Sequence, residues 1–331
     1  MRKREEEQAP DTGARGPTFM YRYVIKRLLM LIPITIITSF LVFFIINLAP
    51  GDVTGQLTGA DATAEEIAAL RAELDLDKPI VVRYAKYFSG LLRGDLGTSY
   101  ITGKSVYDSY MEKLPATLEL AIASIIVSIV ISIPLGISSA VHRGSIRDNV
   151  GMVAALLGLS MPNFWLGLLL IIVFALNLGW LPSGGSDGFA SIILPAITVG
   201  TGLTAMLTRT TRSSMLDVIR QDYLRTARAK GVPERLVIRK HALKNALIPI
   251  ITVIGTQLGS CLGGAILTET VFAWPGVGRL ILDAVNSRDT PMVTGCIILK
   301  TITISVILLI VDLLYAAVDP RIRAQYAKGG K

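Results

Sequence analysis

The chain has 331 residues, of which 51% are hydrophobic, and a formal net charge of +8. Its mean hydropathy of +0.55 indicates a membrane protein and excludes a soluble two-domain enzyme of this length. The basic residues follow the loops between apolar runs, so no nucleic-acid partner is expected. Two cysteines and two histidines, without ligand spacing, exclude a disulfide framework and a metal site.

The N-terminal part predicts a polar tail followed by a membrane span. Residues 1–27 are polar and charged and are expected to form a cytoplasmic tail. Residues 28–50 carry no charge, run too long for the apolar part of a cleavable signal peptide and lack a small-residue cleavage site. They are predicted to form the first transmembrane helix.

Five further apolar runs approach the roughly 20 residues that cross the hydrocarbon core of a bilayer. Prolines within or beside them predict kinked helices whose freed carbonyls are satisfied by neighbours. The expected fold class is therefore an all-α integral membrane protein with six transmembrane helices, the last five of which form a core over 120–318. The five runs are 120–141, 150–176, 190–208, 245–268 and 292–311.

The distribution of lysine and arginine predicts that both chain ends are cytoplasmic. With the N-terminus inside, the cytoplasmic segments hold 23 Lys/Arg and the outer segments hold 9. The short loops all favour this orientation. The cytoplasmic segments are then 1–27, 142–149, 209–244 and 319–331, and the outer ones are 51–119, 177–189 and 269–291.

The charged segment 217–249 has the pattern of a helix, a turn and a short second helix. Ile219, Tyr223 and Ala227 recur at helical spacing. Gly231 supplies a stop, because glycine adopts the left-handed conformation at least cost. Pro233 can open the second helix at its first position, where a missing N–H does no harm. The simplest interpretation is a solvated loop that carries positive-inside charge.

Several motifs carry a resemblance to a known family. RTARAKG followed by HALKNALIP resembles the EAA loop of ABC importer permeases, in the variant of peptide and nickel importers. The opening RYVIKRLL and the later DLGTS, LPATLEL, FAWPGVGR and DPRIR stand in the order found in the first of that family's two permease subunits. The resemblance covers about 21–323. Arg225 departs from it, because many relatives carry Glu there, and the stretch from Gly231 to Pro249 is longer than in sugar permeases.

The resemblance implies a type I importer permease fold in the bacterial inner membrane, with the loop seated in a cleft of an ATPase subunit. It implies a second, paralogous permease, two ATPase subunits, an extracytoplasmic solute-binding protein and surrounding lipid as partners. ATP and Mg²⁺ would be bound by the ATPases, and no catalytic residue, cofactor or metal is expected in this chain. The coupling residues that it implies are Arg225, Thr226, Ala227, Arg228, Lys230, Gly231, Pro233, Glu234, Arg235 and Arg239.

The outer segment before the last span predicts a turn and a short amphipathic helix over 277–286. Taken alone, this is an interfacial helix anchored by its tryptophan. The resemblance instead implies an outer gate near the passage mouth, with its charged residues facing the solute or the binding protein. The turn residues are Trp274, Pro275 and Gly276, and the charged ones are Arg279, Asp283, Arg288 and Asp289.

Two features inside the spans have alternative interpretations. A lysine at mid-bilayer raises the free energy of membrane insertion by roughly 3 kcal/mol. Lys300 is therefore expected either to extend its amino group toward the outer surface or to line the passage. Asp312 lies near the inner end and is expected to reach the wet surface or the basic tail. Gly255, Gly259 and Gly263 leave one helix face nearly bare, for packing within the subunit, for a subunit interface or for the passage.

The expected function is the import of short peptides, with nickel or glutathione-like solutes as alternatives. An ion-driven secondary transporter would carry paired acidic or histidine residues in its spans and an inverted repeat, and neither is evident in the sequence. A membrane scaffold or sensor would not explain a basic helix–turn–helix loop held between two kinked spans.

Overall fold

The computed structural model describes residues 18–58 and 61–318, which form helices, turns and one isolated β-bridge but no β-strand. Residues 1–17 of the predicted N-terminal tail lie outside these ranges. The predicted C-terminal tail 319–331, with its Asp319-Pro320-Arg321 motif, also lies outside them.

Five helices of the described part are long and apolar enough to cross a membrane. The first begins at Thr18, inside the predicted tail, and the second begins at Val106, inside the predicted outer segment. Both helices therefore extend beyond the apolar runs that predicted them. The five are α1 (Thr18–Leu48), α5 (Val106–Val141), α8 (Phe189–Ile219), α11 (Leu243–Gly264) and α14 (Thr290–Val318).

The predicted span 150–176 is broken instead of straight. Helix α6 (Ile146–Ser160) and helix α7 (Asn163–Leu170), which continues into the π-helix η1 (Ile171–Asn177), meet at an angle of 101°. Pro162 explains the break, because proline lacks a backbone N–H and drives the preceding residue into extended conformation. Met161 is extended accordingly, with ψ of 127°. If this pair counts as one span, the described part of the chain has up to six.

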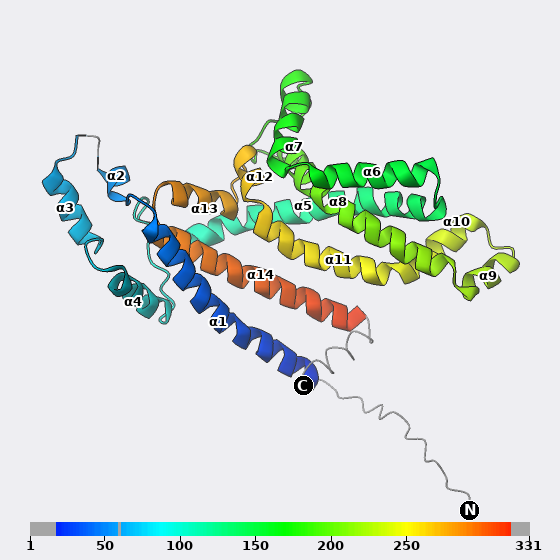
Figure 1. Cartoon of the computed structure of the whole chain (residues 1–331), viewed down its shortest axis with the longest axis horizontal. Coiled ribbons are helices and arrows are strands. Elements are labelled where there is room, and N and C mark those ends of the chain that lie inside the picture. Colours follow the sequence, from blue (N-terminus) through cyan, green and yellow to red (C-terminus); the bar gives the residue numbers. More distant parts are fainter. Residues whose placement is uncertain (1–17, 59–60, 319–331) are drawn as a thin grey trace, which may run out of the picture.

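The long helices lie side by side, most of the short helices gather at their two ends, and α7 projects away from the bundle (Figure 1). α5 packs along α8, α1 along α14, and α11 between α8 and α14. One end carries α9 (Asp222–Ala229), α10 (Glu234–Leu236) and the π-helix η2 (Val237–Ala242). The other end carries α2 (Thr54–Leu57), α3 (Ala64–Glu73), α4 (Ile80–Leu91), α12 (Ile266–Val271) and α13 (Val277–Asn286).

Glycines let α5 and α8 approach closely. A Cβ on Gly136 of α5 would lie 2.6 Å from Cβ of Thr211. A Cβ on Gly200 of α8 would lie 2.7 Å from the carbonyl oxygen of Ser124. In a membrane, where lipid competes for apolar surface, such close packing of small residues is what holds helices together. The α5–α8 pair is therefore the scaffold to which both ends of the molecule attach.

Candidate coupling loop and outer gate

The charged loop forms the helix–turn–helix that the sequence predicted. α9 ends at Ala229, and Gly231 adopts φ of +77°, a conformation that glycine reaches most easily. The N–H of Val232 donates to the Ala227 oxygen (3.2 Å), which closes the end of α9. Pro233 precedes α10 as its N-cap residue, one position earlier than predicted.

Most of the predicted basic coupling residues face solvent. Arg228 differs, because its Nε and Nη2 lie 2.9 and 2.8 Å from the two carboxylate oxygens of Glu234. These hydrogen bonds raise the pKa of Arg228 and tie the two short helices together. Arg228 and Glu234 therefore brace the turn, whereas the resemblance implied that Arg228, with Lys230, Arg235 and Arg239, meets acidic groups on the ATPase. The exposed cations are Arg225, Lys230, Arg235 and Arg239, and the exposed Thr226 bonds back to Asp222 O (3.1 Å).

An apolar face seats the loop on the long helices. Leu224 and Val237 are fully buried against Met215 at the end of α8 and Ala140 at the end of α5. Ile219 and Ala227, two of the three residues noted for their helical spacing, pack at the edge of this cluster. Tyr223 does not, since it is 43% exposed. The predicted helical spacing crosses a break, because Ile219 ends α8 and Tyr223 and Ala227 belong to α9, and it missed the buried Leu224.

A bidentate ion pair joins α6 to α8 near the same end. Arg212 donates from Nε and Nη2 to the two carboxylate oxygens of Asp148, both at 2.7 Å. Asp148 is 3% exposed and also accepts the N–H of Gly144 at 3.0 Å. Sequence analysis did not single out either residue, because 63 residues separate them along the chain.

At the end of the bundle opposite the charged loop, Trp274 is a core residue. It is 2% exposed, packs with Leu120 and Ile192, and donates from Nε1 to the carbonyl oxygen of Ala116 (2.8 Å). The interpretation of Trp274 as an interfacial anchor is therefore wrong. The neighbouring Pro275 is half-buried and forms the turn that leads into α13.

A fully buried carboxylate holds this turn in place. Glu269 accepts the hydroxyl of Thr117 of α5 at 2.9 Å and the N–H of Arg279 of α13 at 2.9 Å. A Cβ on Gly276 or Gly278 would lie 2.3 or 2.7 Å from carboxyl atoms of Glu269, so only glycine fits at both positions. Sequence analysis missed Glu269, although a lone acidic residue in an apolar stretch was a usable signal.

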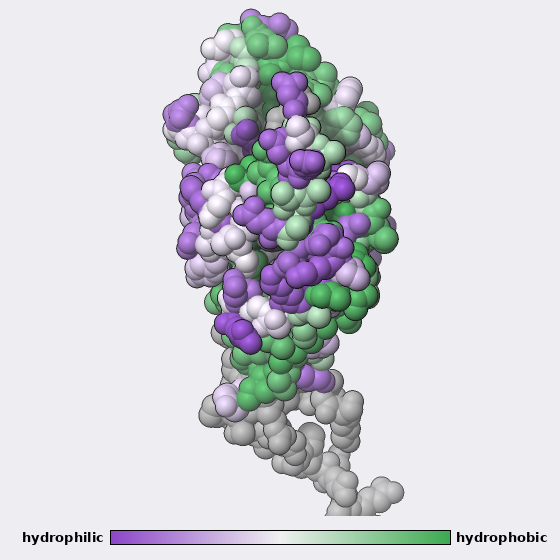
Figure 2. Space-filling model, turned by 90° about the vertical axis from the view of Figure 1, so that its left-hand side faces the viewer, coloured by the Kyte–Doolittle hydropathy of each residue, from purple (hydrophilic) through white to green (hydrophobic). Residues whose placement is uncertain are grey.

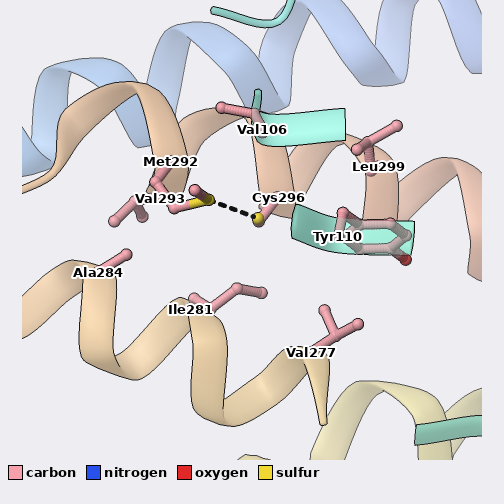
Figure 3. Packing of buried hydrophobic residues seen from close by; sticks show 9 residues of the cluster. All are labelled: Val106, Tyr110, Val277, Ile281, Ala284, Met292, Val293, Cys296 and Leu299. Atoms are coloured by element: carbon pink, nitrogen blue, oxygen red, sulfur yellow. Dashed lines mark hydrogen bonds between the residues drawn. The ribbon is translucent and has the colours of Figure 1, made fainter. Parts of the chain in front are cut away.

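Helix α13 is fixed by a hydrophobic cluster that it shares with α5 and α14 (Figure 3). Val277 and Ile281 of α13 belong to the same cluster as Tyr110 of α5, and Val277 points toward that ring. The sulfur atoms of Cys296 and Met292 lie 3.5 Å apart. These contacts bury one face of α13 and leave Asp283, Val285 and Asn286 exposed.

Only some of the predicted gate charges are accessible. Arg279 and Asp283 are partly exposed and lie 3.8 Å apart. Asp289 is 2% exposed and accepts the Ser99 hydroxyl at 2.5 Å, so the expectation that it faces solute is wrong. Arg288 is half-buried, with φ of +59°.

The two charged residues of the last span, Lys300 and Asp312, both form polar contacts in the structure. Lys300 donates from Nζ to the Gly263 oxygen at the end of α11 (3.2 Å), where helix carbonyls are unpaired. Asp312 accepts the Tyr23 hydroxyl (2.7 Å), with Arg27 at 3.7 Å, so its contacts come from the start of α1.

Two of the three spaced glycines pack within the subunit. A Cβ on Gly255 would lie 1.7 Å from the Tyr315 hydroxyl, and one on Gly259 would lie 3.0 Å from Leu308. Both contacts join α11 to α14. A Cβ on Gly263 would have no neighbour within 4 Å, and its carbonyl oxygen accepts the hydrogen bond from Lys300.

Comparison with known proteins decides the family. Residues 132–324 match the family described as binding-protein-dependent transport system inner membrane component, and residues 20–121 match its N-terminal counterpart. The chain belongs to this family. The chain is therefore a permease subunit of an ABC importer and a multi-pass protein of the bacterial inner membrane. Such importers work with ATPase and binding-protein partners.

Two relatives resemble this permease in sequence, and one solved structure resembles it in fold. It is 44% identical, over 304 residues, to the glutathione transport system permease proteins GsiC of Salmonella typhimurium and Escherichia coli K12. The alignment covers 92% of this chain and 99% of each relative. An inward-facing structure of the MetNI methionine ABC transporter shares the fold, with a TM-score of 0.54, 20% identity, and coverage of 64% of this chain and 96% of that chain.

Proposed function

We propose that this permease forms half of a passage for short peptides, glutathione included, beside a second, paralogous permease. Two ATPase subunits and a solute-binding protein complete the assembly in this proposal. The observation that carries it is the 44% identity to permeases named for glutathione transport, over nearly their whole length. Glutathione is itself a tripeptide, so the two solute classes overlap. Nickel chelates are the competing solute.

The geometry of the α9–α10 loop supports a coupling role. Its exposed side carries cations, which suit an acidic cleft on an ATPase. Its opposite side is close-packed through Leu224 and Val237 onto α5 and α8. A packed interior transmits displacement because it cannot absorb it locally. When an ATPase moves α9, the ends of α5 and α8 therefore move with it, and α6 follows through the Asp148–Arg212 pair.

At the far end, the same helices carry the outer turn. Thr117 of α5 accepts the N–H of Val277 at 2.8 Å and donates to Glu269, and Ala116 accepts from Trp274. Helix α13 is thus fastened to α5 at its N-terminal end. In the proposed cycle, ATP-driven movement enters at α9, travels along α5 and α8, and shifts α13 so that the passage opens outward.

The test is co-purification of the tagged chain in mild detergent, followed by an ATPase assay. We expect a second permease and ATPase chains, and hydrolysis stimulated by the binding protein loaded with glutathione or a dipeptide. Stimulation by a nickel chelate alone would replace the peptide assignment. Recovery of the chain without any ATPase partner, and without hydrolysis, would overturn the coupling role.

A further inference from the structure

A pocket of about 260 Å³ lies at the outer end of α1, under the short helices of the outer segment. Three arginines from three separate segments line it: Arg71 of α3, Arg83 of α4 and Arg288 between α13 and α14. The rest of the lining comes from the end of α1 and the segment that follows it, from Leu76 and Tyr100, and from Thr290 of α14. Segments far apart in the sequence thus bring positive charge to one small volume.

The arginines keep donors that no described residue uses. Asp52 is the only carboxylate in the wall, and its oxygens already accept from Thr54 and from Nε of Arg71 (2.8 Å). The two terminal amino groups of Arg71 therefore remain available. Arg83 and Arg288 form no ion pair within the described part of the chain, and Arg83 lies 6.0 Å from the ring centre of Phe43. The wall carries a net excess of two positive charges.

The surrounding backbone is fixed, so the pocket is a built feature. Asp75, in the turn between α3 and α4, has φ of +59° and pairs with Lys78 and Lys86. These hydrogen bonds lower the pKa of Asp75 to about 2, so Asp75 stays ionised and paired with both lysines at physiological pH. Arg288 also has φ of +59°, a conformation that costs energy outside glycine, and the buried Asp289 follows it.

The pocket lies beside exposed apolar side chains at the end of α1. Ile45 and Leu48, in the last turn of α1, are 65% and 77% exposed. Their neighbours Ile46, Asn47 and Ala49 line the pocket. Figure 2 views this end of the molecule, where hydrophilic side chains gather over the middle of the face and apolar side chains lie below them. A molecule with a charged head and an apolar tail fits both surfaces at once.

We propose that this pocket binds a phosphate group, from the headgroup of an anionic phospholipid of the outer leaflet or from a free phosphate ion. Arginine presents planar paired donors that match phosphate oxygens. A headgroup phosphate would accept from Arg83 and Arg288, while its acyl chains lie along Ile45 and Leu48. The bound phosphate links α3 and α4 to the start of α14 and so stiffens the outer face beside α13.

The test uses the full-length chain with its co-purifying partners, reconstituted with phosphatidylglycerol and phosphatidylcholine in equal amounts. Native mass spectrometry reports which lipid stays bound, and thermal unfolding of delipidated protein with inorganic phosphate provides the second arm. The variant is Arg83→Gln/Arg288→Gln, and the control is Arg93→Gln, which removes an exposed arginine of the same segment outside the pocket.

We expect the wild type and Arg93→Gln to retain phosphatidylglycerol in preference to phosphatidylcholine. The double variant should bind phosphatidylglycerol with an affinity at least roughly tenfold lower. Stabilisation by free phosphate without lipid selectivity, lost in the double variant, assigns the site to the soluble ion. A wild type that retains both lipids equally and ignores phosphate overturns the proposal, whether or not the variants fold. Equal retention by wild type and double variant does the same.

Discussion

Glu269 is one of the residues that attach the turn before α13 to α5. Its carboxylate accepts from Thr117 of α5 and from the backbone of α13, and no solvent reaches it. A buried carboxylate at this position is stabilised by the unpaired N–H groups that begin a helix. Gly276 and Gly278 leave room for its side chain, so this contact depends on the residue type at three positions.

Glu269→Gln tests that contact. The amide places N–H groups against donors, so at least one buried hydrogen bond is lost, at a cost of about 1–3 kcal/mol. We expect the variant to insert normally but to show uptake reduced several-fold, because α13 no longer follows α5. Uptake into cells, with immunoblots of the membrane fraction, provides the measurement. The control is Glu65→Gln, an exposed glutamate in the first turn of α3, and wild-type uptake by Glu269→Gln would refute this role.

The spaced glycines of α11 give a second prediction for single residues. Alanine at Gly255 would place Cβ 1.7 Å from the Tyr315 hydroxyl, and overpacking of this kind costs about 1–3 kcal/mol. Alanine at Gly263 meets open space and gains up to about 1 kcal/mol of helix propensity. We expect Gly255→Ala to lower the unfolding temperature in detergent and Gly263→Ala to leave it unchanged or raise it. The reverse order would contradict the packing of α11 against α14.

Among the elements, the α9–α10 loop makes the sharpest prediction. Gly231 has φ of +77° and Gly144, in the turn before α6, has φ of +76°, and neither has a neighbour within 4 Å of its would-be Cβ. Valine at either position therefore introduces similar strain, about 1–2 kcal/mol. We expect both variants to insert, but only Gly231→Val to separate ATP hydrolysis from uptake, since only that turn orders the coupling loop.

The assay compares ATPase activity with uptake in proteoliposomes that contain the partner subunits. The ratio of uptake to hydrolysis should fall in Gly231→Val and stay at the wild-type value in Gly144→Val. A normal ratio in Gly231→Val would remove the coupling assignment from this loop.

The sequence predicted elements better than contacts, for physical reasons. Hydropathy locates the residues that lie in hydrocarbon, but polar turns can continue a helix, so the extra turns of α1 and α5 were not anticipated. Pro162 predicted a kink, yet its angle depends on what packs around it. Gly231 was predictable because its requirement is local. The burial of Trp274 and Asp289 was not, because their partners lie more than 150 residues away.

For the whole molecule, the remaining test is how many times the chain crosses the membrane. The bent pair of α6 and α7–η1 either crosses as one broken span or returns to its own side. The native Cys261 and Cys296 are 3% and 0% exposed, so added cysteines can be labelled against a low background. Asp77→Cys, Arg143→Cys and Asp187→Cys place exposed probes after α3, before α6 and before α8.

We expect a membrane-impermeant maleimide added to intact spheroplasts to label Asp77→Cys and Asp187→Cys, and to label Arg143→Cys only after permeabilisation. Labelling of Asp187→Cys only after permeabilisation would mean that the bent pair returns to the cytoplasm. The crossing by α8 would then carry the α9–α10 loop outside the cell. Ten basic residues over 209–244 make that placement unfavourable, since basic loops stay on the cytoplasmic side. The proposed coupling role also needs this loop on the side where ATP is, so the charge distribution and the proposed function both favour a crossing by the broken pair.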